Sequence, residues 1–175
     1  SIDTYQTCPF RYLMSYDYGF EYPPFFMQNY GIILHNCLNK LHSSMKMNEE
    51  IKGAKIKHIV ERCWIQIHKN KKNDELEKRR LERSLLDYYY DTKEYIKEVI
   101  STEEPFSISK KNMERNGRTD LLIKNKEDEI ELIDFKARDK KGIDLLEVEF
   151  QLKMYDYALK DKYHIDKLCA YTFKD

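Results

Sequence analysis

Two charged side chains interrupt an apolar segment at residues 131–139, ELIDFKARD. In a strand, side chains two residues apart point to the same face, so Asp134 and Lys136 are neighbours, while Ile133 and Phe135 face the other way. The simplest explanation is an ion pair that tolerates partial burial. Taken alone, the pair does not define a site.

A second carboxylate precedes it in GRTDLLIK, residues 117–124, where a hairpin would bring Asp120 beside Asp134. Two close carboxylates repel each other unless one is protonated or a cation lies between them. Mg²⁺ and Mn²⁺ accept carboxylate oxygens, a backbone carbonyl and waters. A lysine beside such an ion can hold an attacking water or stabilise charge on a phosphoryl group. The pattern indicates metal-assisted phosphodiester hydrolysis.

Helical spacing dominates the first hundred residues. A short helix is expected within residues 1–18, interrupted at CPF, and EYPPFF at 21–26 marks a break. Amphipathic helices are expected at 31–45 and 55–69. The charged run HKNKKNDELEKRR, residues 68–80, is expected to be a connector before a long helix that reaches about residue 100.

The pattern then changes to short strands. Strands are expected at PFSISK (105–110), RTDLLIK (118–124) and EIELIDFKAR (129–138), with turn residues NKEDE between the last two. A helix at about 145–160 and a strand, KLCAYTF (167–173), follow, and the helix allows the last strand to pair beside the hairpin. The expected fold is α/β: a small mixed βββαβ sheet flanked by helices, with a helical N-terminal lobe. We expect one domain over 1–175, with the lobe at about 1–100 and the catalytic core at about 101–175.

Composition excludes several classes of protein. Basic and acidic residues number 31 each, so no overall charge argues for nucleic acid or membrane, and any such partner must be recognised locally. The four cysteines are scattered without zinc spacing, and no segment predicts a membrane span or signal peptide. We therefore expect a cytoplasmic protein with free thiols. The chain starts at Ser1 without Met, and we expect it to be part of a longer protein.

Four motifs in order resemble the PD-(D/E)XK nuclease superfamily. They are SIDTYQTCPFRYLMSY, the Gly-x-x-x-His of GIILHNCLNKL, the D-x13-D-x-K that ends at Lys136, and the Gln-x-x-x-Tyr of QLKMYDYAL. Together they resemble the RecB-like nuclease domains at the C-terminus of UvrD/Rep-type DNA helicases. The resemblance covers nearly the whole chain, and it implies a restriction-endonuclease-like core.

The resemblance also implies roles for particular residues. His35, Asp120, Asp134 and the backbone carbonyl of Phe135 would bind Mg²⁺ or Mn²⁺, and Lys136 would be the catalytic lysine. Gln151 and Tyr155, one helical turn apart, would flank the site and orient Lys136, a phosphate or a water. Each has a simpler alternative: His35 as a hydrogen-bonded, partly buried histidine, and Gln151 and Tyr155 as part of an amphipathic helix. Glu104 would be a minor, more distant contributor.

Other parts of the chain bear on cofactors and DNA. Cys8 matches the first ligand of the iron-sulfur cluster found in some relatives, but the other three cysteines do not fit, so we expect no cluster. Charge and stacking for nucleic acid are expected from Arg11, Tyr12, Lys110, Lys111, Arg115 and Arg118. The HKNKK and EKRR runs are expected to be solvated faces.

The expected function is a metal-dependent deoxyribonuclease that acts on DNA supplied by a helicase motor, in repair or recombination. A rival from another class is a nuclease-like module that binds DNA or a protein without cleaving. A third is a structure-specific endonuclease that works without a motor. Presence of His35, Asp120, Asp134 and Lys136 together favours the first.

Overall fold

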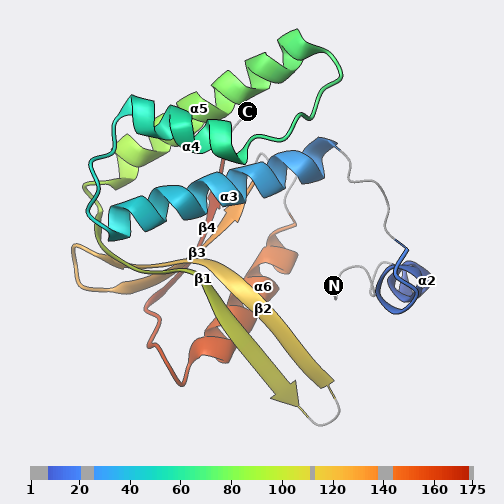
Figure 1. Ribbon diagram of the computed structural model, residues 1–175. Coiled ribbons are helices and arrows are strands. Elements are labelled where there is room, and N and C mark those ends of the chain that lie inside the picture. Colours follow the sequence, from blue (N-terminus) through green and yellow to red (C-terminus); the bar gives the residue numbers. More distant parts are fainter. Residues whose placement is uncertain (1–7, 21–25, 111–112, 138–143, 174–175) are drawn as a thin grey trace.

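A four-stranded sheet with helices on both faces forms the core of the molecule (Figure 1). The computed structural model describes residues 8–20, 26–110, 113–137 and 144–173, without the side chains of 26–28, 110 and 113–115. The elements are α2 (Pro9–Tyr12), a π-helical turn η1 (Leu13–Asp17), α3 (Phe26–Lys46), α4 (Gly53–Cys63), α5 (Lys71–Thr92), β1 (Ile96–Lys110), β2 (Met113–Asn125), β3 (Ile130–Lys136), α6 (Leu145–Leu159) and β4 (Lys167–Thr172).

The strands lie in the order β1-β2-β3-β4. β1, β2 and β3 pair antiparallel, whereas β4 runs parallel to β3 after the α6 crossover. A parallel neighbour needs such a crossover because a tight turn can only reverse the chain. The mixed βββαβ sheet expected from the sequence is therefore confirmed.

Because successive side chains point to opposite faces of each strand, an apolar core forms on each face of the sheet. Leu121 and Ile123 pack with the buried faces of α3, α4 and α5. Leu122 and Leu132 pack instead with Val148, Leu152, Tyr155 and Leu159 of α6. The sheet is thus buried on both sides, which fixes its position relative to α3 and α6.

Phe135 anchors β3 in an aromatic cluster. Its ring lies 5.7 Å from that of His42 and 5.8 Å from that of Tyr88, centroid to centroid. Burial lowers the pKa of His42 to about 4, so the ring is neutral at pH 7. Since Nδ1 faces the carbonyl of Leu38 at 2.8 Å, Nδ1 carries the proton, and Nε2 accepts from the Tyr88 hydroxyl at 2.8 Å.

Residues 96–100, expected to end a helix, begin β1 instead. Ile96 and Val99 are both buried against the helical layer, and their spacing of three resembles helical periodicity. The ladder with β2 contains irregularities between Ile96 and Glu98 and between Val99 and Ser101. Such irregularities place side chains on a face of the sheet that regular alternation would not give them. The helix predicted for residues 96–100 is therefore wrong because the strand is irregular there.

The helix expected to reach residue 69 ends at Cys63, and most of the expected charged connector is the start of α5. Asp74, in the first turn of α5, explains the change. One of its oxygens accepts the indole N–H of Trp64 at 2.9 Å, and the other accepts the backbone N–H groups of Ile67 and His68 at 2.8 and 2.9 Å. These bonds hold residues 64–68 in an extended path.

The N-terminal helical segment lies apart from the sheet in Figure 1. Residues 8–20 expose large apolar side chains, among them Phe10, Tyr16 and Phe20. Within the described residues, no helix is both long and apolar enough to span a bilayer.

Replacing Asp74 tests the extended path. We expect Asp74→Ala to lower the free energy of unfolding by about 1–3 kcal/mol, because three donors lose their acceptor. Hydrogen bonds hold the pKa of Asp74 below its ordinary value of 3.8 despite partial burial. The carboxylate therefore stabilises the fold above that value, and the stabilisation is lost as pH falls toward the folded-state pKa.

Urea unfolding of both proteins at pH 7 and at pH 3 measures this effect. Glu75→Ala is the matched control, since Glu75 is exposed and pairs with Arg79 at 3.7 Å. A loss of stability for Asp74→Ala no greater than that for Glu75→Ala would contradict the explanation.

Candidate active site

Two carboxylates meet across the β2–β3 ladder. Leu121 pairs with Ile133, so the next step of the antiparallel register places Asp120 opposite Asp134. Both share the face of Leu122 and Leu132, toward α6. Asp134 is buried, with 3% of its surface exposed, whereas the side chain of Asp120 is 22% exposed. The hairpin thus brings together two acids that are 14 residues apart.

Asp120 is held by one side-chain donor and one backbone donor. Its Oδ1 is 3.2 Å from Nδ1 of His35, which α3 brings to the end of the sheet. Its Oδ2 accepts the backbone N–H of Phe135 at 2.7 Å. The sequence pointed to the carbonyl of Phe135, but nothing in it identified this N–H bond, which requires the observed register.

Lys136 connects the strand to α6. Its Nζ lies 2.8 Å from Oδ2 of Asp134 and donates to Oε1 of Gln151 at 2.7 Å. The amide of Gln151 in turn donates to the hydroxyl of Tyr155. Asp144 caps the N-terminus of α6 through the N–H of Leu146 at 2.9 Å, which fixes where the helix begins.

Burial and neighbouring charges together shift the pKa values of Asp134 and His35. Burial raises the pKa of Asp134, the charge of Asp120 adds to this, and Lys136 opposes it. Burial lowers the pKa of His35, but its hydrogen bond to Asp120 and the nearby carboxylates outweigh burial, so the pKa lies above its ordinary value. The Asp120 carboxylate therefore raises the pKa of both Asp134 and His35, the effect expected of a negative charge at this end of the sheet.

The donor atoms suit a hard divalent cation, although they are not gathered around one point. In the described part of the chain, no three His, Cys, Asp or Glu side chains are arranged to hold a metal ion. Asp120 is instead bonded to His35 and to the N–H of Phe135. Oδ2 of Asp134 is nevertheless buried without a hydrogen bond, because the nearby Lys136 ammonium lacks the required angles. A buried carboxylate oxygen of this kind fits a cation.

Three of the six expected nucleic-acid residues have described side chains. Arg11 and Tyr12 lie on α2, where Tyr12 stacks on Tyr16 at 4.7 Å, and Arg118 lies on β2, 3.2 Å from Glu103. Lys111 lies outside the described residues, as do the side chains of Lys110 and Arg115. The three described side chains therefore lie on two different elements, α2 and β2.

Two other expectations have different structural surroundings. Glu104 is buried and pairs with Lys162, which follows α6, rather than with the carboxylate pair. The sulfur of Cys8 accepts the N–H of Arg11 at 3.4 Å and caps α2. Both contacts are structural.

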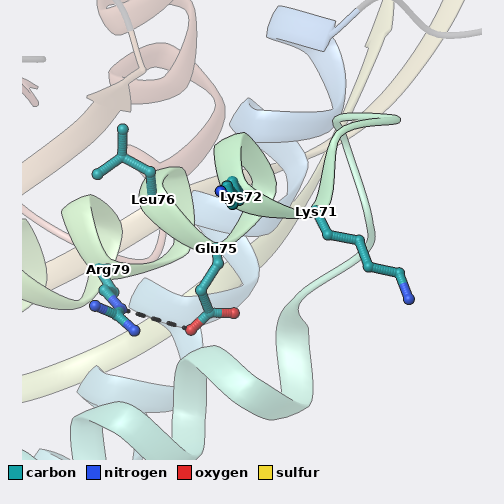
Figure 2. Close-up of a pocket in the computed structure, with 5 residues that line it drawn as sticks. All are labelled: Lys71, Lys72, Glu75, Leu76 and Arg79. Atoms are coloured by element: carbon teal, nitrogen blue, oxygen red, sulfur yellow. Dashed lines mark ion pairs between the residues drawn. The ribbon is translucent and has the colours of Figure 1, made fainter.

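The charged runs at 68–80 include a shallow hollow on α5. Figure 2 shows its lining residues, Lys71, Lys72, Glu75, Leu76 and Arg79, with Glu75 paired to Arg79. None of the residues expected to act in catalysis lines it. An open surface crossed by its own ion pair agrees with a solvated face.

Comparison with known protein families shows which family the chain belongs to. The family model "PD-(D/E)XK nuclease superfamily" matches residues 1–171. The chain belongs to the PD-(D/E)XK nuclease superfamily. Among curated proteins, none matches the chain. The family supports a nuclease that hydrolyses phosphodiester bonds of DNA, and its members typically use divalent metals.

Neutralising Asp134 tests the balance of charges. In a solution with a metal chelator, we expect Asp134→Asn to raise the free energy of unfolding by about 1–2 kcal/mol, because it removes a buried charge that faces another carboxylate. Thermal and urea unfolding measure the gain. Asp120→Asn should give no such gain, since both oxygens of Asp120 already have donors. Lower stability of Asp134→Asn would show that its pairing with Lys136 outweighs burial and repulsion.

Proposed function

We propose that this chain is a divalent-metal-dependent deoxyribonuclease domain that works on DNA strands delivered by a helicase, in repair or recombination. One observation carries the catalytic part. Lys136 Nζ lies within 2.8 Å of both Asp134 and Gln151, beside a second carboxylate, Asp120. An ammonium group fixed at a carboxylate pair is suited to phosphoryl chemistry, where charge develops on oxygen.

His35, Asp120, Asp134 and the carbonyl of Phe135 are the proposed metal-binding groups. When bound there, Mg²⁺ or Mn²⁺ would supply positive charge next to the scissile phosphate and make a water easier to deprotonate. The buried Oδ2 of Asp134, which lacks a hydrogen bond, supports this assignment.

The remaining catalytic roles would belong to side chains of the protein itself. Lys136 is 25% exposed at its side chain, so its ammonium can reach a substrate while Gln151 holds it from the side of α6. It would orient the attacking water and stabilise charge on a phosphate oxygen. Tyr155 is 8% exposed and orients Gln151 through its hydroxyl. Gln151 and Tyr155 therefore act through the position of Lys136.

The expected DNA affinity and the order of the motifs support the proposed coupling to a helicase. The chain has no net charge, and Arg118 is paired with Glu103, so the expected affinity of the isolated chain for phosphates is modest. A motor that is covalently linked would raise the local concentration of DNA. The four RecB-like motifs support this partner. Under this proposal the whole protein acts in the cytoplasm.

Cleavage assays test the catalytic assignment. We expect Lys136→Ala and Asp120→Ala to reduce kcat for cleavage of single- and double-stranded DNA at least about 100-fold with Mg²⁺ or Mn²⁺, since each removes a group that acts on developing charge or positions it. Lys153→Ala is the matched control: this exposed lysine on α6 pairs only with Glu149 among the contacts described. Equal activity of all four proteins would refute the mechanism, and DNA binding without cleavage would favour the module that only binds.

Metal binding is testable without cleavage. We expect saturating Mn²⁺, at about 100 times its dissociation constant, to raise the melting temperature of the protein by about 5–10 °C relative to chelator. Asp134→Ala should lose most of this shift, because it removes the buried oxygen. Glu149→Gln, which changes an exposed carboxylate on α6, should keep it. Equal shifts in all three proteins would place the ion elsewhere.

A further inference from the structure

A line of contacts leads from Lys136 through α6 to the long β1–β2 hairpin. Lys136 donates to Gln151, and Gln151 donates to the hydroxyl of Tyr155. The ring of Tyr155 then packs on that of Phe106 in β1, with centroids 5.4 Å apart and planes inclined by 57°. Phe106 lies 30 residues before Lys136 in the sequence, and no sequence motif connects the two.

Phe106 is confined on its second side by β2. Its partner in the ladder is Gly117, and the ring lies directly over this glycine. A Cβ added at Gly117 would be 2.4 Å from Cζ of Phe106, far inside contact distance. Only glycine leaves room for the ring, which is 8% exposed between Gly117 and Tyr155. The position of the Phe106 ring is therefore determined from both sides.

Because the Phe106 ring is confined, it limits the position of the Tyr155 ring. Tyr155 in turn limits the orientation of the side-chain amide of Gln151. The Gln151 side chain alone has three rotatable bonds, and its Oε1 meets the ammonium of Lys136 only in a narrow set of rotamers. Aromatic pairs prefer defined separations and inclinations, so a ring at Phe106 limits where the Tyr155 hydroxyl can lie. The hairpin is thus connected to the reacting centre through side chains that each have one preferred arrangement.

We propose that Phe106 is a positioning residue for Lys136, acting through Tyr155 and Gln151, with Gly117 providing the space that holds its ring in place. This inference rests on the proposed nuclease function for its kinetic consequence. Simple core packing would make Phe106 important for stability alone. Positioning requires in addition that the effect of Phe106 on turnover depends on Gln151.

A double-mutant cycle distinguishes the two roles. We expect Phe106→Leu, which keeps an apolar side chain but removes the ring, to lower kcat about tenfold with KM for DNA changed less than about twofold. In a Gln151→Ala background, Phe106→Leu should lower kcat by less than about twofold further, because the residue it acts through is gone. Ile108→Ala is the matched control: Ile108 packs on the same apolar cluster from the same strand. It should leave kcat within about twofold of the unchanged protein.

A second variant moves the ring without removing it. Gly117→Ala should displace Phe106 and lower kcat to a similar extent as Phe106→Leu, again only when Gln151 is present. Tenfold losses that are equal with and without Gln151, or a loss confined to KM, would overturn the proposal. Circular dichroism confirms that each variant is folded before kinetics are compared.

Nuclear magnetic resonance gives a readout that does not depend on cleavage. The side-chain amide signals of Gln151, identified by their loss in Gln151→Ala, should exchange with solvent about tenfold faster in Phe106→Leu but not in Ile108→Ala. If the unchanged protein fails to cleave DNA, the proposed function fails, yet faster exchange still supports the positioning role. Unchanged exchange in Phe106→Leu would overturn that role whatever the cleavage assay shows.

Discussion

Asp120 and Asp134 occupy facing positions of one antiparallel ladder, and their mutual repulsion has to be offset within a few ångströms. Each carboxylate is compensated differently. Asp120 receives the imidazole of His35 and a backbone N–H, whereas buried Asp134 has the ammonium of Lys136 beside it. These donors thus offset the repulsion that a cation between the two carboxylates would otherwise offset. Under the proposed function, a divalent cation would bind at this pair.

The two faces of the sheet contribute different partners to this pair. From one side α3 contributes His35, and from the other α6 contributes Gln151. Neither helix could hold its residue in place without the cores that attach it to the strands. The aromatic cluster around Phe135 adds a further constraint, because it fixes the strand residue between the acid and the lysine. The buried apolar packing on both faces of the sheet therefore determines the distances between the polar groups of the site.

Local pattern predicted the βββαβ sheet and the meeting of Asp120 with Asp134, whereas the family resemblance pointed to His35, Gln151 and Tyr155. Alternating apolar residues indicated β2 and β3, and the long spacing between β3 and β4 required a crossover. Prediction failed where side-chain contacts overrode spacing. Ile96 and Val99 kept a helical spacing in a bulged strand, and the spacing of Trp64 and Ile67 continued a helix that the bonds of Asp74 end early. Contacts of Phe106 and the N–H of Phe135 depend on register, which a single sequence does not reveal.

Parallel pairing of β3 with β4 has a consequence for the order in which the chain is made. β3 carries Asp134 and Lys136, yet one of its two edges stays without a hydrogen-bonding neighbour until Lys167–Thr172 has been synthesised. Gln151 also follows β3 in the chain. During synthesis, an emerging polypeptide that already contains both acids and the lysine still lacks the strand and helix that hold them. Long-range pairing of this kind forms late, so the proposed active site is completed only after nearly all of these residues have left the ribosome.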